Sequence, residues 1–459
     1  MLENEIKQKE RQRQKFQEDL IKLLIFLFTL LMIFLIIHKI KTDTNKETIA
    51  QNKIDTILQQ LDKTNTVSIN KYIVYGTHFN IEGTLELPKI SGITVSSANI
   101  IAKTIDDTEI IIKSDYTYKD GKLSFSTSEK INSGIDLESL SNTLYYLSLK
   151  VTFSNSDIKY YGFTNATEYQ DITYYTITKN NSNNKVKISF DKYNDTSFMK
   201  IDVSDSSLPE DVYDIVIDPG HGGTDVGAVS GDYNEANITL SVAIKLKLEL
   251  ENLGLKVLMT RDTNTPKEAL TAYSMYDENG RVSVTARSSA KLMLSLHLNS
   301  NTTNVQNGGL EIYAPSNCDL NFATLLAQNI ISISGTSYSQ NSTYKKADGV
   351  YVRNYNKADI LVAENIAKKS GYEPYNITTS TPYLYMIREI GGIATNAFVD
   401  GRNKSYGENK YRNSNVGVEG YLIELGYMVI QEDLNNIINN SELYVKGIAQ
   451  SISDFYLQK

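Results

Sequence analysis

The sequence is poor in cysteine, in histidine and in clustered positive charge, and each shortage excludes a class of protein. The single cysteine, Cys318, cannot form an internal disulfide, and one thiol excludes a cysteine-based zinc finger or redox pair. The net charge is -8 and no basic stripe occurs beyond the first residues, so nucleic acid is not a predicted partner. Because there is only one cysteine, any zinc must be held by histidine and carboxylate, and the chain has only four histidines.

One long apolar run lies near the N-terminus. Residues 23–37 carry no charge, and their neighbours extend the run to residues 20–40, which is nearly enough to span a bilayer. No small-residue cleavage pattern follows, so a single-pass transmembrane helix is predicted rather than a signal peptide or a buried core helix. Lysine and arginine are denser before the run than after it, which predicts that residues 1–19 form a cytoplasmic tail at the cell membrane and that the rest is extracytoplasmic.

Three patterns follow the apolar run. Residues 41–66 carry a narrow helical stripe of isoleucine and leucine and are predicted to form a stalk or linker. Residues 67–205 contain many short alternating segments separated by turns, including an Asp-Gly hairpin signal at 120–121, and predict an all-β, sandwich-like domain that positions or binds. Beyond residue 211, apolar strands alternate with helical stretches, which predicts an α/β domain over residues 211–459.

In this α/β domain we expect a mostly parallel sheet with helices on both faces. The predicted strands are 214–217, 255–259, 292–296, 310–313 and 421–425, and the predicted helices are 237–253, 321–332 and 441–456.

Polar residues occur where three of these strands end. His221 follows the first strand, His297 ends another, and Glu424 lies near the end of the last. Because ligands of open α/β sheets bind at the carboxyl ends of strands, these groups should converge on one edge. Two histidines and one glutamate form an established zinc-ligand set. Glu235 opens the helix after the His221 loop and is predicted to be the third ligand, which leaves Glu424 as a general base.

Each of these residues also has an ordinary structural interpretation. A single histidine beside a strand is usually structural, and only the pairing of His221 with His297 favours ligation. Glu235 alone could simply be an acidic residue in a first helical turn, where the helix dipole favours negative charge. Glu424 could form a structural salt bridge, although a carboxylate in an apolar strand is costly unless it is paired or functional.

Four motifs carry a resemblance to a known family. They are Asp-Pro-Gly-His-Gly-Gly-Thr-Asp at 218–225, Asn-Glu-Ala at 234–236, Ser-Leu-His-Leu-Asn at 295–299 and Ile-Glu-Leu-Gly-Tyr at 423–427. In this order they resemble the zinc-dependent N-acetylmuramoyl-L-alanine amidases of the amidase_3 family, cell-wall hydrolases. The resemblance covers about residues 211–459. It implies that His221, Glu235 and His297 bind one zinc ion and that Glu424 is catalytic. It also matches Arg281 to a family arginine, to which we assign only a structural role.

The resemblance implies a membrane-anchored enzyme that hydrolyses the amide between N-acetylmuramic acid and L-alanine of the peptidoglycan stem peptide. The β-rich region would then be a wall-binding or positioning domain. Two alternatives remain open: a zinc peptidase that cuts within the stem peptide, and a catalytically weak wall-binding or regulatory module. A long insertion at about residues 335–418 departs from the compact family pattern and could shape or cover the substrate cleft. No protein partner is predicted.

Overall fold

The computed structural model describes most of the chain. The described residues are 2–89, 91–127, 133–164, 171–264, 280–281, 284–285, 288–300, 308–316, 320–370, 378–381 and 416–458. Cys318 and much of the predicted insertion lie outside them. The chain divides into two compact units, Met1–Gln60 and Leu61–Lys459.

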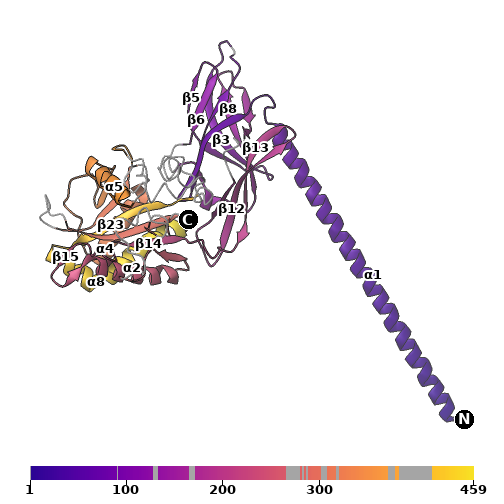
Figure 1. The fold of residues 1–459 in the computed structure, drawn as a ribbon. Helices are drawn as coiled ribbons and strands as arrows, with labels where there is room; N and C mark the ends of the chain where they lie inside the picture. The colour runs from indigo at the N-terminus through magenta and orange to yellow at the C-terminus, as the bar shows by residue number, and fades with distance from the viewer. Residues whose placement is uncertain are drawn as a thin grey trace. The chain divides into compact units, whose positions relative to one another are not determined.

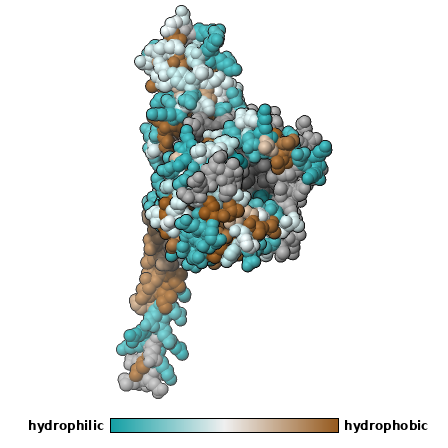
Figure 2. Space-filling model, turned by 90° about the vertical axis from the view of Figure 1, so that its left-hand side faces the viewer, coloured by the Kyte–Doolittle hydropathy of each residue, from teal (hydrophilic) through white to brown (hydrophobic). Residues whose placement is uncertain are grey.

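The first unit is one helix, α1 (Leu2–Gln59). Among the described residues, Ile6–Lys39 is the one helical segment long and apolar enough to cross a membrane, judged by length and composition alone. Its apolar side chains are exposed and appear as the brown part of the helix in Figure 2. The predicted stalk is not set apart from this segment, because the helix continues unbroken to Gln59. A signal sequence can have the same length and composition, so membrane anchoring stays a prediction.

The N-terminal part of the second unit contains two seven-stranded sheets whose strands come almost entirely from residues 67–206. One has the order β10-β1-β2-β6-β5, with β7 on β2 and β22 on β1; the other has the order β11-β12-β13-β8-β3-β4, with β9 on β8. Their strands are β1 (Val67–Tyr75), β2 (His78–Glu86), β3 (Val95–Thr104), β4 (Glu109–Lys113), β5 (Asp115–Lys119), β6 (Lys122–Ser126), β7 (Ile135–Asp136), β8 (Leu144–Phe153), β9 (Ile158–Tyr161), β10 (Phe163–Thr164), β11 (Ile172–Tyr175), β12 (Asn183–Tyr193), β13 (Thr196–Ser206) and β22 (Val416–Gly417), with a short 3-10 helix at Leu137–Ser139.

The β5–β6 hairpin has the turn that the sequence predicts. Asp120 and Gly121 have φ angles of 54° and 87°, and Lys119 pairs with Lys122 across the turn. Two central residues with positive φ match the twist of the flanking strands, which is why Asp-Gly is favoured there.

The C-terminal part contains the third sheet, in the order β17-β14-β18-β23-β19-β21-β20. It is a mixed sheet: β17, β14, β18 and β23 are mutually parallel, whereas β19 runs antiparallel to β23 and parallel to β21. Its strands are β14 (Ile215–Pro219), β17 (Val257–Met259), β18 (Leu292–Asn299), β19 (Glu311–Pro315), β20 (Lys345–Ala347), β21 (Val350–Arg353) and β23 (Glu419–Tyr427); β15 (Val229–Ser230) and β16 (Tyr233–Asn234) form a small ribbon.

Helices α2 (Glu235–Asn252), α4 (Leu320–Ser334) and α8 (Gln431–Ile452) pack together on one face of this sheet, and α5 (Lys357–Ser370) lies on the other side (Figure 1). A short π-helix at Ser453–Leu457 follows α8. Alternate residues of each strand face the three packed helices: Leu294, Leu296 and Leu298 of β18 and Ile423 and Leu425 of β23 belong to their core. His297 and Glu424 therefore lie on the opposite face.

Helix α8 is longer than the sequence predicts, because it begins at Gln431 rather than at residue 441. Its first half carries four asparagines, which have low helix propensity and obscure the apolar pattern. Leu434 and Ile437 nevertheless bury against the core, and the helix is interrupted at Asn440, where φ is -121°. Tertiary burial thus stabilises a helix that local propensity does not predict.

Candidate metal centre

His221 lies in a tight turn directly after β14. Its φ angle is 61°, and Gly222 and Gly223 follow with 117° and 64°. Glycine adopts this left-handed region without cost, whereas His221 is strained there. Gly220 allows the turn to touch the neighbouring strand, since a Cβ atom at 220 would lie 2.4 Å from Cε1 of His297. The turn therefore folds His221 back over the end of the sheet.

Glu235 is the first residue of α2. The side chain of Asn234 caps this helix by accepting a hydrogen bond from the backbone N–H of Asn237. The Glu235 carboxylate points back toward the sheet, is 3% exposed as a residue, and accepts hydrogen bonds from the backbone N–H groups of Ala228 (3.0 Å) and Leu298 (2.9 Å). These two bonds fix the carboxylate between the His221 loop and β18.

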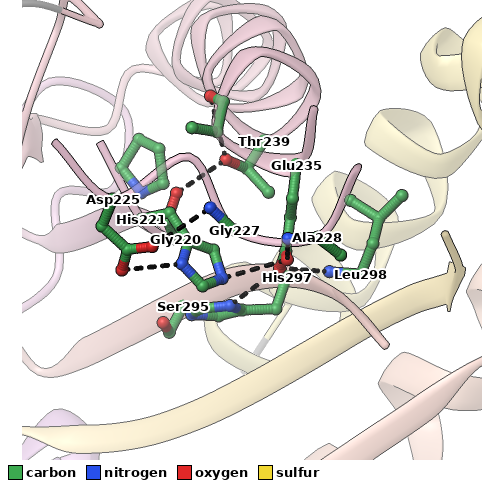
Figure 3. A network of polar contacts seen from close by, with 12 residues as sticks. Gly220, His221, Asp225, Gly227, Ala228, Glu235, Thr239, Ser295, His297 and Leu298 are labelled. Carbon is green, nitrogen blue, oxygen red and sulfur yellow. Dashed lines mark hydrogen bonds and ion pairs between the residues drawn. The ribbon is translucent and has the colours of Figure 1, made fainter. Parts of the chain in front are cut away.

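The three predicted ligands meet at this point (Figure 3). Nε2 of His221 lies 3.0 Å from Oε2 of Glu235, and Nδ1 of His297 lies 3.1 Å from Oε1. One donor atom from each of the three side chains lies within 4.8 Å of the others. Residues 62 positions apart in the chain, Glu235 and His297, are thus in contact.

The charges in this cluster stabilise one another. Burial alone would raise the pKa of Glu235, but contacts with His221 and His297 outweigh it and hold the pKa well below the ordinary value. Burial would lower the pKa of His221, whereas Glu235 and Asp225 outweigh it and raise the pKa. The cluster is therefore built around an ionised carboxylate between two imidazole rings.

A cation fits this arrangement. The donor set, two imidazoles and one carboxylate, is one that zinc uses. The donor atoms of the three side chains already lie close together. Asp225 supplies an outer partner: its Oδ2 lies 2.9 Å from Nδ1 of His221 and leaves Nε2 directed at the cluster. A carboxylate behind a ligating histidine is a recurring feature of metal sites.

Glu424 lies beside this cluster on β23. In the strand register it pairs with His297 of β18 on one side and with Glu311 of β19 on the other. Within the described part of the chain its Oε2 atom is buried and has no hydrogen-bond partner. Burial raises the pKa of Glu424 well above the ordinary value, and the negative charges of Glu235 and Glu311 add to this effect.

Glu311 was not identified from the sequence. It is fully buried and accepts hydrogen bonds from the hydroxyl groups of Tyr427 (2.6 Å), Ser339 (2.6 Å) and Tyr313 (2.9 Å) and from Nδ2 of Asn299 (3.1 Å). These donors come from four separate segments, so only the folded chain brings them together. The alternation of Glu311 with buried apolar residues in β19 was the one available signal.

Asp225, Asp218 and Arg261 were likewise not assigned a role from the sequence, although the first two belong to the glycine-rich motif. Asp218 is buried at the end of β14 and accepts two hydrogen bonds from Nη1 of Arg281 (2.8 and 3.0 Å). Arg281 thus has the structural contact expected of it. Arg261 follows β17 and donates to backbone carbonyls of the His221 loop.

The fold and this side-chain set define a class: an α/β protein with a candidate His-Glu-His metal centre and a buried carboxyl group at one sheet edge. Residues 215–381 match the Amidase_3 family, N-acetylmuramoyl-L-alanine amidase. The similarity to that family is therefore shown for this part of the chain. The match begins at β14 and includes His221, Glu235 and His297, whereas Glu424 lies beyond its end.

Two curated relatives illustrate the similarity. The germination-specific N-acetylmuramoyl-L-alanine amidase of Bacillus subtilis (strain 168) is 38% identical over 112 residues, which are 23% of this chain and 47% of that protein. The N-acetylmuramoyl-L-alanine amidase AmiA of Escherichia coli (strain K12) is 32% identical over 104 residues, 22% of this chain and 32% of that protein. The chain therefore spans less than half the length of each.

Among solved structures, the N-acetylmuramoyl-L-alanine amidase AmiC2 of Nostoc punctiforme is 21% identical, with a TM-score of 0.32. The alignment covers 53% of this chain and 97% of that one. At this TM-score the likeness adds nothing to the argument from the site.

Proposed function

We propose that this chain is a zinc-dependent N-acetylmuramoyl-L-alanine amidase. The observation that carries the proposal is the convergence of His221, Glu235 and His297 beside the buried carboxyl group of Glu424. Its support from other proteins is the Amidase_3 match over residues 215–381. The proposed reaction is hydrolysis of the amide that joins N-acetylmuramic acid to L-alanine of the stem peptide in peptidoglycan.

The proposed roles are as follows for the metal ligands and their supports. His221, Glu235 and His297 would hold one zinc ion, which supplies Lewis-acid polarisation and lowers the pKa of water. Asp225 orients His221, and the backbone N–H groups of Ala228 and Leu298 orient Glu235.

Glu424 moves the protons. Its carboxylate accepts a proton from the attacking water, whose oxygen bonds to the amide carbon. As the carbon–nitrogen bond breaks, Glu424 returns that proton to the nitrogen of the departing L-alanine. Burial raises the pKa of Glu424, which favours its accepting the proton in the first step of the proposed reaction.

The proposed location is the cell membrane. The apolar segment Ile6–Lys39 would anchor the chain, with the N-terminus in the cytoplasm and the metal centre outside, where peptidoglycan is found. The β-rich region at 67–205 would position the metal-bearing domain at 211–459 on the wall.

The test is mass spectrometry of purified peptidoglycan after incubation with the full chain in detergent and zinc. New peptides that begin with a free L-alanine amine, abolished by a chelator, are the expected result. Cuts elsewhere in the stem would indicate a peptidase, and intact peptidoglycan with bound protein would indicate a binding module. Either outcome would overturn the proposed reaction.

A further inference from the structure

The carbonyl groups of Pro219, Gly220 and His221, at the start of the metal-site turn, each accept a hydrogen bond from an arginine side chain. Nε of Arg261 donates to the carbonyl of Pro219 (3.0 Å), and Nη2 of Arg261 donates to that of Gly220 (2.8 Å). Nη2 of Arg281 donates to the carbonyl of His221 (3.1 Å). Three consecutive peptide groups thus have their acceptors fixed by two guanidinium groups from other segments of the chain.

Arg261 also joins this turn to the helix that carries Glu235. The same Nη2 atom donates to the carbonyl of Ala236 (2.9 Å) and lies 3.2 Å from the hydroxyl of Thr239, which itself donates to Gly220 (2.9 Å). Arg261 is only 4% exposed, and a Cβ atom at Gly222 would lie 2.8 Å from it. The guanidinium group therefore sits between the elements that supply His221 and Glu235.

Arg281 is anchored from its other side. Nη1 makes two hydrogen bonds to the buried carboxylate of Asp218, which also accepts from the hydroxyls of Thr260 (2.6 Å) and Ser295 (2.7 Å). Both oxygens of the Asp218 carboxylate thus hold the same nitrogen of Arg281. The Nη2 atom that reaches His221 consequently has little freedom.

These contacts stabilise an unfavourable backbone conformation at His221. His221 adopts a φ angle of 61°, in a region that is unfavourable for a non-glycine residue. Such a conformation persists only where surrounding contacts over-determine it. Backbone pairing in the turn joins Gly222 to Asp225, whereas the carbonyl of His221 itself accepts from Arg281. The carbonyl of Gly220 accepts from Arg261 and Thr239.

We infer that Arg261 and Arg281 are positioning residues of the metal centre, which hold His221 in its ligating conformation and tie it to Glu235. The inference rests on the metal site of the proposed function. Among the contacts of the described residues, both side chains reach the ligands' segments through backbone carbonyls, so their effect passes through the backbone. Loss of partners outside the ligand shell typically weakens metal binding by about 10- to 100-fold.

The test uses Arg261→Lys and Arg281→Lys in the full chain in detergent. Lysine keeps the positive charge, including the attraction to Asp218, but lacks the planar fork that reaches several acceptors at once. Zinc affinity of the chelator-stripped protein is measured by competition with an indicator, and the absorption spectrum of the Co²⁺ form reports ligand geometry. Arg353→Lys, at an arginine that lies 5.7 Å from the ring centres of Tyr313 and Tyr344, is the matched control.

We expect the folded fraction of each lysine variant to bind zinc about 10- to 100-fold more weakly and to give an altered Co²⁺ spectrum. Arg353→Lys should keep the parent affinity. Unchanged zinc affinity in both Arg261→Lys and Arg281→Lys would overturn the inference. So would a loss of affinity that only follows a loss of folded protein, measured by circular dichroism in the same samples.

If a lysine variant fails to fold, Arg261→Ala takes its place and is assayed with and without added guanidinium ion. The added ion is expected to restore zinc affinity. Failure to restore it counts against the inference. If the parent chain itself binds no zinc, the metal-dependent function fails first. If the parent binds zinc and hydrolyses peptidoglycan but the two lysine variants bind zinc with the parent's affinity, only this inference fails.

Discussion

At the scale of single residues, the site divides between groups that would bind a cation and a group that would move protons. His221, Glu235 and His297 contact one another directly. Glu424 is their neighbour through the strand register and has no hydrogen bond to any of them among the described contacts. Metal retention and turnover should therefore respond differently to substitution.

We expect Glu424→Gln to keep the metal and to lose hydrolysis by about 10²- to 10⁴-fold, because the amide cannot act as a general base. His221→Ala should lose both, since it removes a ligand. Zinc content by atomic absorption and release of peptides from peptidoglycan are the two measurements. Loss of zinc from the Glu424 variant would contradict this division of roles.

Asp218 should make stability depend on acid pH. Burial would raise the pKa of Asp218, but Arg281, Thr260 and Ser295 outweigh it and hold the pKa below its ordinary value. The unfolded chain therefore binds the proton more readily, so the stabilisation is complete above a pH of about 3.9 and is lost as the pH falls through the lower folded pKa.

Asp218→Asn should accordingly cost about 3 kcal/mol at pH 7, because Arg281 loses its charged partner, and the difference from the parent should shrink below pH 4. Urea unfolding in the presence of chelator at both pH values is the measurement. Asp232→Asn, at an exposed carboxylate, is the control and should change stability by less than about 0.5 kcal/mol. An unchanged gap at low pH would refute the linkage.

At the scale of elements, the packing of α4 against α8 supports the sheet that carries the site. Gly447 of α8 allows a close approach, because a Cβ atom there would lie 2.7 Å from the Cα atom of Ile330 in α4. Because the contacted atom belongs to the backbone of α4, a side-chain rotation cannot relieve the clash and the two helices would have to move apart.

Gly447→Ala should destabilise the protein by about 1–3 kcal/mol through overpacking, although alanine is intrinsically the better helix former. Lys446→Ala, at the exposed neighbouring position, should change little. The denaturant midpoints of the two variants are compared with that of the parent. A Gly447→Ala protein as stable as the parent would show that the two helices can separate freely.

At the scale of the whole molecule, the β-rich region and the metal-bearing region share buried polar contacts within the unit Leu61–Lys459. Asp214, just before β14, accepts hydrogen bonds from the backbone N–H (3.0 Å) and the hydroxyl (2.7 Å) of Thr178. Lys291, just before β18, is 1% exposed, lies 3.9 Å from Asp214 and stands over the ring of Tyr174. Strand β22, just ahead of β23, pairs with β1.

Lys291→Met should lower the free energy of unfolding by about 3 kcal/mol, because it leaves Asp214 buried without its cation. Lys247→Met is the control: Lys247 makes an exposed pair with Glu251, worth at most about 0.5 kcal/mol. Urea unfolding measures both. Equal effects of the two substitutions would mean that the buried pair of Lys291 and Asp214 adds nothing to the free energy of unfolding beyond what an exposed pair adds.

The sequence by itself determined the glycine-rich turn, the apolar N-terminal run and most strands, because these depend on local periodicity and on residue type. Its motifs also predicted the four residues of the candidate site, whose roles stay a proposal. Only the tertiary structure decided that Glu311 faces Glu424, that Arg261 and Arg281 hold the His221 turn, that α8 starts at Gln431 and that Lys291 is buried beside Asp214. The physical reason is that strand register and the burial of a charge are set by contacts between segments distant in the chain, which no short window of sequence contains.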